Sequence, residues 1–191
     1  MEADFSVELG RDDPALEIPW AAENGPRYLD LKRNSELLFE LEEAQRFSEL
    51  RDFLAFLNSA SSILESAKCD AWTSDQMHPE EEIFGAAWKF GSYVDLLFSD
   101  DEARFSFDDH ERFARRIVEL LKHVPEIPAS AEFIIRRCYY HEGSDTRDGF
   151  YITLYVLGFG DDEEQARQQW GIGLKLMENA IRQPRLFHRV Q

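Results

Sequence analysis

The alternation of apolar and polar positions is clearest between residues 131 and 181. Residues 132–141 alternate in a way that is typical of a strand. The polar residues 142–149 end in Asp-Gly, so we expect a loop there. Residues 150–159 carry apolar side chains at both odd and even positions, which indicates an interior strand covered on each side.

A capped helix is expected after this pair of strands. Asp161 is predicted as the N-cap, with Glu164 in the capping-box position, and Pro184 ends the helix. Gly171 and Gly173 lie inside it, and we interpret them as places where the helix approaches the sheet closely. The apolar stripe that must pack on the sheet consists of Trp170, Leu174, Met177 and Ile181.

An earlier stretch of the chain shows a similar order of elements. Residues 67–72 read as a strand, and the even positions of residues 84–98 are mostly apolar, which predicts a long second strand. We interpret Gly91 as a bulge within that strand, and the alternative is a two-residue hairpin turn at Gly91-Ser92. Residues 104–107 are expected to add a short strand after a charged loop.

The helix that closes this earlier stretch is predicted to be capped by Asp108. Its apolar stripe has the same spacing as the later one, and a cysteine, Cys69 or Cys138, lies in the first strand of each stretch. These matches predict two tandem β-β-α units at residues 63–128 and 129–191. The stripe residues are Phe113, Ile117, Leu120 and Val124.

The first 62 residues are expected to form a β meander and a helical segment. Pro19 lacks an amide hydrogen, so the second strand of the meander should lie at a sheet edge. A helix is predicted to begin at Asn34 or Ser35, and its pattern either continues or restarts at Ser48. A turn is expected at residues 24–26.

These elements predict a single α+β domain over residues 1–191. Its core would be an antiparallel sheet built from the two tandem units, with their helices on one face. The doubly apolar strand at residues 150–159 then needs cover on its other face. The N-terminal helix or a second subunit could provide that cover, and the second case is a homodimer.

Composition and charge narrow the class of protein. The chain has 191 residues, of which 43% are hydrophobic, and this is enough for one sizeable core. No apolar run approaches the roughly 18 residues of a membrane-spanning helix, and the N-terminus is acidic, so a cytoplasmic protein is expected. The formal net charge of −17 disfavours binding to nucleic acid and to anionic membranes, and favours a basic protein partner. The tail, with Arg185, His188 and Arg189, is locally basic.

No motif specific for a reaction is present, and no cofactor or metal is predicted. His78 lies among glutamates and could join them around a metal, but a solvated acidic loop explains the same residues. Cys69 and Cys138 are expected to be buried thiols. Aromatic residues such as Trp72 and Trp88 could line a pocket, although strand spacing is more typical of core positions.

His141 is the best candidate for a general base, because it follows a strand and precedes a polar loop. Arg137, Tyr139 and Tyr140 lie beside it in sequence, and together the four residues could bind an anionic small molecule, with arginine supplying charge and tyrosine stacking. The alternative is that the arginines pair with the many carboxylates of this chain.

The sequence therefore favours a non-enzymatic protein-interaction module, of a regulatory or immunity type, that binds a basic partner. Whether the chain is an enzyme stays open. The alternative is a small-molecule-binding or enzymatic domain with its pocket near Tyr140 and His141. A third hypothesis, an acidic mimic of nucleic acid, requires carboxylates in a regular double row at phosphate-like spacing.

Overall fold

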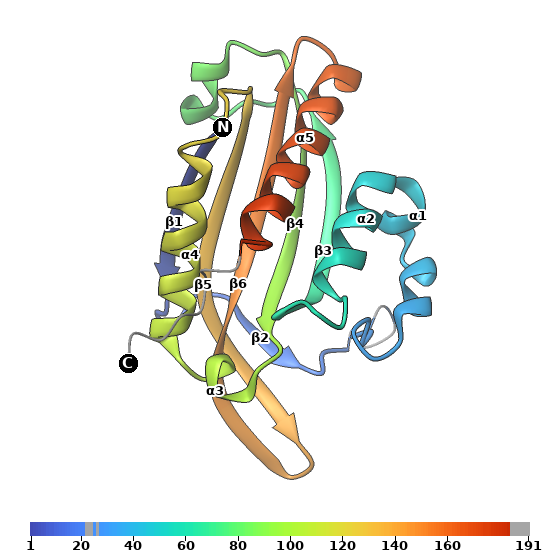
Figure 1. Ribbon diagram of the computed structural model, residues 1–191, viewed down its shortest axis with the longest axis vertical. Coiled ribbons are helices and arrows are strands. Elements are labelled where there is room, and N and C mark those ends of the chain that lie inside the picture. The colour runs from blue at the N-terminus through green and yellow to red at the C-terminus, as the bar shows by residue number, and fades with distance from the viewer. Residues whose placement is uncertain (22–24, 26, 184–191) are drawn as a thin grey trace.

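A computed structural model describes residues 1–21, 25 and 27–183 (Figure 1). The strands are β1 (Glu2–Glu8), β2 (Ala15–Ile18), β3 (Leu64–Ser74), β4 (Trp88–Phe98), β5 (Ala129–Glu142) and β6 (Asp145–Gly160). The helices are η1 (Ser35–Glu40), α1 (Glu42–Arg46), α2 (Ser48–Leu57), η2 (Pro79–Phe84), α3 (Asp101–Arg104), α4 (Phe107–Leu121) and α5 (Glu163–Ile181). The basic tail residues Arg185, His188 and Arg189, and most of the predicted turn at residues 24–26, lie outside the described residues.

A mixed six-stranded sheet forms the centre of the molecule. The strand order is β1-β5-β6-β4-β3, and β2 also pairs with β5. The α+β class is confirmed, but the sheet is antiparallel only among β3 to β6. β1 and β2 each run parallel to β5 and do not pair with each other, so the predicted meander is wrong. The 14 residues of β5 give an outer edge long enough for both short strands to lie end to end.

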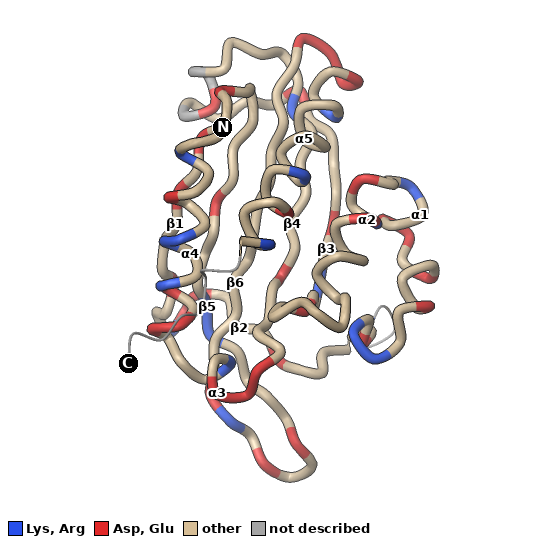
Figure 2. The backbone as a smooth tube through the Cα atoms, in the orientation of Figure 1, with Lys and Arg blue, Asp and Glu red and all other residues tan. Residues whose placement is uncertain are grey.

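The hairpin of β5 and β6 is longer than the sequence pattern indicates. Residues 142–149 were predicted as a loop, but pairing continues down to Glu142 and Asp145, and the turn is made at Gly143 with φ of +65°. The hairpin end extends below the rest of the sheet in Figure 1, and Figure 2 shows that it carries charged residues of both signs. Backbone pairing holds these exposed residues in strands even though they carry no apolar pattern.

Two elements of the middle region differ from the prediction. The segment expected as a short strand at residues 104–107 instead contains the end of α3 and the start of α4. β4 runs straight through, as predicted, but its pairing is regular at Gly91, and the bulge lies in β3 between Ser66 and Lys68. The N-terminal helix restarts at Ser48, one of the two predicted options.

The caps of the two long helices lie close to the predicted positions. The Ser106 side chain accepts the Asp109 N–H and begins α4 two residues before the predicted cap. Asp162 caps α5 by accepting the Gln165 N–H, one residue after the predicted cap. Local polar residues compete for such positions, so sequence fixes a cap only to within a turn.

Glycines set how closely α5 packs. A Cβ on Gly173 would touch Val156 of the sheet, as predicted, whereas a Cβ on Gly171 would approach Glu49 of α2 instead. The closest approach involves Gly158 of β6, where a Cβ would collide with the backbone of Trp170. The absence of a side chain at Gly158 therefore allows α5 to lie directly on the strand.

All three long helices lie on the same face of the sheet (Figure 1). α2 packs with α5 and beside β3, within the main apolar core. The option that the N-terminal helix covers the other face is therefore wrong. One end of that other face is covered by η2, whose Phe84 ring stacks on Phe159 at 4.2 Å. The other end is covered by a smaller cluster of Leu16, Ala67, Leu97, Cys138, Tyr140 and Tyr151, with Trp20, Tyr28 and Phe105 packed against it.

The predicted tandem repeat is neither confirmed nor excluded. Two antiparallel hairpins, β3-β4 and β5-β6, adjoin through β4 and β6. However, β3 lies at a sheet edge whereas β5 has neighbours on both sides, and α4 packs beside β1 whereas α5 packs on its own β6. Internal duplication stays a prediction. No described helix is long and apolar enough to cross a membrane.

Candidate functional site

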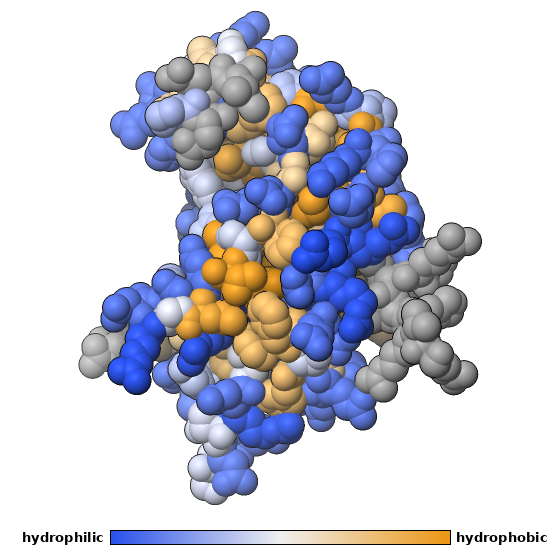
Figure 3. Space-filling model, turned by 90° about the vertical axis from the view of Figure 1, so that its left-hand side faces the viewer, coloured by the Kyte–Doolittle hydropathy of each residue, from blue (hydrophilic) through white to orange (hydrophobic). Residues whose placement is uncertain are grey.

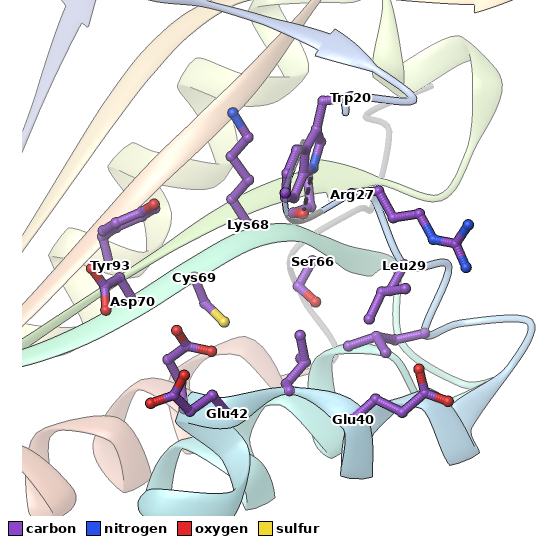
Figure 4. Close-up of a pocket in the computed structure, with 15 residues that line it drawn as sticks. Trp20, Arg27, Leu29, Glu40, Glu42, Ser66, Lys68, Cys69, Asp70 and Tyr93 are labelled. Carbon is purple, nitrogen blue, oxygen red and sulfur yellow. Dashed lines mark hydrogen bonds between the residues drawn. The ribbon is translucent and has the colours of Figure 1, made fainter. Parts of the chain in front are cut away.

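A groove of about 760 Å³ runs beside the outer edge of β3 (Figure 4). We call it the β3 groove, and its first wall is formed by residues 66–70 of β3. The second wall is formed by residues 40–43, where η1 ends and α1 begins. In Figure 4, Ser66 and Cys69 point toward α1, whereas Trp20 and Lys68 lie on the opposite side of the strand. The groove thus straddles a sheet edge.

Side chains of the same molecule already occupy the first half of this edge. The Leu64 carbonyl accepts from Lys32 Nζ at 2.8 Å, and the Ala67 carbonyl accepts from Trp20 Nε1 at 2.9 Å. The Ser66 N–H donates to Asn58 Oδ1 at 3.1 Å. Beyond these bonds no described strand pairs with the outer edge of residues 68–74. The second half of β3 is therefore an open strand edge.

Part-buried polar contacts of Lys32 hold the chain segments next to the groove in place. The Lys32 ammonium donates to the carbonyls of Ser59 at 3.2 Å, Ser62 at 2.6 Å and Leu64 at 2.8 Å. Burial lowers the pKa of Lys32 below its ordinary value. Because this one side chain ties the segment before η1 to the start of β3, the groove exists before any partner binds.

The β3 groove is electronegative. Four carboxylates line it, from Glu40, Glu42, Glu43 and Asp70, against two cationic side chains, Arg27 and Lys68. Lys68 Nζ lies 4.7 Å from the centre of the Trp20 ring, so part of its charge is engaged there. The surplus of carboxylates favours a positively charged occupant.

The carboxylates of the groove also affect the pKa of the Cys69 thiol. Burial, followed by the charges of Glu43 and Asp70, raises the pKa of the Cys69 thiol to about 12. Burial also raises the pKa of Cys138 to about 12. Both thiols are therefore protonated at neutral pH, and neither is activated as a nucleophile.

A buried polar network lies next to the groove on the face without helices. Asp95 is only 6% exposed, and its Oδ1 accepts from Thr153 Oγ1 at 2.7 Å. Arg136 donates to Thr153 Oγ1 at 2.9 Å and to Glu8 Oε2 at 2.8 Å. Burial raises the pKa of Asp95 from 3.8 to about 6, against the Thr153 hydrogen bond and the charge of Lys68, which lower it.

Replacing Asp95 with asparagine is expected to stabilise the protein at pH 8. A carboxyl whose folded-state pKa is raised contributes stability below pH 3.8, and that contribution is lost as the pH rises through about 6. Asp95→Asn avoids the buried charge and keeps an acceptor for Thr153, so we expect a gain of roughly 1–3 kcal/mol at pH 8 and almost none at pH 3.5. Urea unfolding of both proteins at the two pH values measures this, and a gain that is independent of pH would contradict it.

The four residues predicted as a ligand site lie at the far end of β5. Arg137, Tyr139 and His141 share one face of the strand, whereas Tyr140 lies buried on the other, with its hydroxyl donating to the Phe150 carbonyl at 3.2 Å. The four side chains therefore do not gather at one site, because Tyr140 lies on the opposite face of β5 from the other three. None of the four lines the β3 groove.

Like Tyr140, two more of these predicted residues have partners within the chain. Arg137 Nε donates to the Leu9 carbonyl at 3.1 Å, and His141 Nε2 lies 3.2 Å from Glu17 Oε2. A ligand site at His141 stays a prediction. Within residues 1–21, 25 and 27–183, no three His, Cys, Asp or Glu side chains gather so that they could hold a metal ion.

The residues of the β3 groove were not found from the sequence. The odd positions of β4 include the polar residues Lys89, Tyr93 and Asp95, and this could have indicated a face that the long helices do not cover. Nothing in the local pattern indicates that β3 lies at the edge, because that depends on strand order. The acidic run at residues 40–43 reads as an ordinary solvated helix face until β3 is placed beside it.

Comparison of the chain with protein families, with curated proteins and with solved structures found no match. The class that the fold itself defines is an α+β protein with a mixed six-stranded sheet and helices on it.

Proposed function

We propose that this protein is a non-enzymatic interaction module that binds an extended, basic segment of a partner protein in the β3 groove. The observation that carries the proposal is the open edge of residues 68–74 beside a preformed groove with surplus carboxylates. A strand added to a sheet edge gains backbone hydrogen bonds along its length, and its side chains give specificity.

The chemistry of the occupant follows from the two walls. An added strand presents alternate side chains to the two sides of β3. One set would lie beside Cys69 and near Glu43, and the other beside Asp70. Lysine or arginine at these positions would meet carboxylates, and the net charge of −17 would speed its approach. A regulatory or immunity role is compatible with such binding.

The proposal is tested with a fluorescent hexapeptide of alternating lysine and valine. Glu42→Lys, Glu43→Lys and Asp70→Lys together should weaken its binding at least tenfold at about 0.15 M salt, where long-range attraction is screened. The three reversals add two charges each, so the net charge changes from −17 to −11. Peptide binding should also slow amide hydrogen exchange at residues 69–73.

The matched control carries Glu126→Lys, Glu142→Lys and Asp148→Lys. These exposed residues lie away from the β3 groove, and the variant has the same net charge of −11. It should bind the peptide within about twofold of the unaltered protein. If both triple variants lose affinity equally, then only overall charge attracts the peptide and the β3 groove is not its site.

A further inference from the structure

One line of side chains crosses the sheet on the face without helices. Cross-strand pairing places Asp70 beside Tyr93, Tyr93 beside Tyr155, Tyr155 beside Glu132, and Glu132 beside Asp4. Residues paired in register on one face lie side by side, so two tyrosine rings are flanked by a carboxylate at one end and by two at the other. Asp70 belongs to the β3 groove, and the line leads away from it.

Trp72 completes an aromatic surface on this line. Its ring centre lies 6.5 Å from that of Tyr155 at an interplanar angle of 73°, and Tyr93 lies 6.0 Å from Tyr155. A side chain at Gly91 would collide with Leu157 and Trp72, so this glycine allows the indole to pack against β4. We call Trp72, Tyr93 and Tyr155 the aromatic row. All three are half-buried and retain surface open to solvent.

A second hollow, of about 840 Å³, begins where the aromatic row ends. Trp72, Tyr155, Glu132 and Asp4 line it, and η2 forms its outer wall. The face of the sheet that α4 and α5 leave uncovered forms the left margin of the space-filling view, and this margin is indented (Figure 3).

Both lysines that line the second hollow have a carboxylate partner. Lys89 Nζ contacts Glu81 Oε2 at 2.7 Å, and their side chains are only 7% and 10% exposed. Lys122, also at the hollow, lies 3.3 Å from Glu119. The carboxylates that line the hollow, from Glu2, Asp4, Glu81 and Glu132, outnumber the two lysines, which makes the hollow favourable for a cation and unfavourable for an anion.

We propose that the second hollow binds the guanidinium group of an arginine side chain, stacked on Trp72 and Tyr155 and facing Asp4 and Glu132. The inference deepens the proposed function and rests on it, because the same basic segment, paired along the outer edge of β3, would reach Trp72, which lines the second hollow. A guanidinium is planar, stacks on aromatic rings and is weakly hydrated, whereas a lysine ammonium is compact and strongly hydrated. The structure therefore assigns arginine rather than lysine to this position.

The test uses N-acetylated hexa-arginine and hexa-lysine amides as probes, with binding measured by calorimetry at about 0.15 M salt. The unaltered protein should bind hexa-arginine several-fold more tightly than hexa-lysine. The double variant Trp72→Leu, Tyr155→Leu keeps every charge, and it should bind hexa-arginine about tenfold more weakly and lose the preference for arginine. Unchanged affinity in the double variant would overturn the inference.

Two further variants show whether weaker hexa-arginine binding comes from the site itself or from a folding defect. Tyr139→Leu removes a half-buried tyrosine that lines neither hollow and should leave hexa-arginine binding unchanged. Asp4→Asn with Glu132→Gln keeps the aromatic row and should weaken hexa-arginine binding about tenfold, since it removes the facing carboxylates. If Tyr139→Leu weakens the binding as much as the loss of Trp72 and Tyr155, the aromatic row is not the site.

The two proposals fail separately. If the unaltered protein shows no preference for hexa-arginine but still binds the lysine-valine peptide in the β3 groove, the second hollow is rejected and the proposed function is kept. Loss of peptide binding to β3, with the arginine preference still dependent on Trp72 and Tyr155, would reject the β3 groove and leave an arginine site that acts without strand addition.

Discussion

Replacing Gly158 with alanine is expected to lower the free energy of unfolding by about 3 kcal/mol or more. The new Cβ would lie 2.7 Å from the Cα of Trp170 and would collide with backbone atoms of α5, which cannot move aside as a flexible side chain can. Because Trp170 is fully buried and donates to Ser92 Oγ at 2.9 Å, a shift of α5 would also disturb this contact. Urea unfolding followed by circular dichroism measures the loss.

Gly171→Ala is the matched control within the same packing region. A Cβ on Gly171 meets only the Glu49 side chain, at 3.2 Å, and that side chain can move. Alanine also has a higher helix propensity than glycine by up to about 1 kcal/mol, so the variant should be neutral or more stable. A Gly158→Ala protein as stable as Gly171→Ala would show that α5 does not rest on β6 in this way.

Replacing Lys89 with alanine is expected to cost roughly 3–5 kcal/mol of folding free energy. Lys89 Nζ donates to both carboxylate oxygens of Glu81, at 2.9 and 2.7 Å, and Glu81 Oε2 also accepts the His78 N–H at 2.7 Å. Without the ammonium, Glu81 would be a buried carboxylate that has lost its countercharge. Guanidinium unfolding would show the loss as a lower midpoint.

The double variant Lys89→Met, Glu81→Leu distinguishes the effect of losing the whole ion pair from the effect of leaving Glu81 without its countercharge. Apolar side chains of similar size remove both charges together, and such replacements of buried ion pairs are often neutral or stabilising. We therefore expect the double variant to recover most of the stability lost in Lys89→Ala. If it is as unstable as the single variant, the ion pair itself contributes the stability.

Cover at both ends of the second face of the sheet explains the doubly apolar pattern of β6. Tyr151 and Thr153 are 4% and 2% exposed there, although no helix covers them. Large neighbouring side chains and the cluster around Leu16 shield one part of the face, and the part near Tyr155 stays half-open. A second subunit on that face stays a prediction, and the proposed partner segment would occupy the same surface.

Elements with strong local signals could be predicted from the sequence. The stripes of α4 and α5, the alternation in β4 and β5, and the stop of the last helix before Pro184 depend on neighbours along the chain. The candidate site could not be predicted in the same way. Residues 40–43, Trp20 and residues 66–70 are far apart in sequence, and only strand order and loop path bring them together around the β3 groove.

The sequence by itself determined the acidic charge of −17 and indicated the long periodic elements, namely β4, β5, α4 and α5. It also predicted two buried thiols, of which Cys138 is buried and Cys69 is only half-buried. These properties depend on local periodicity and composition. Only the tertiary structure decided that β1 and β2 pair in parallel with β5, that α2 lies on the same face as α5, and that β3 keeps an open edge. Strand order and helix placement are set by packing between residues distant in the chain, where many arrangements satisfy the same local pattern.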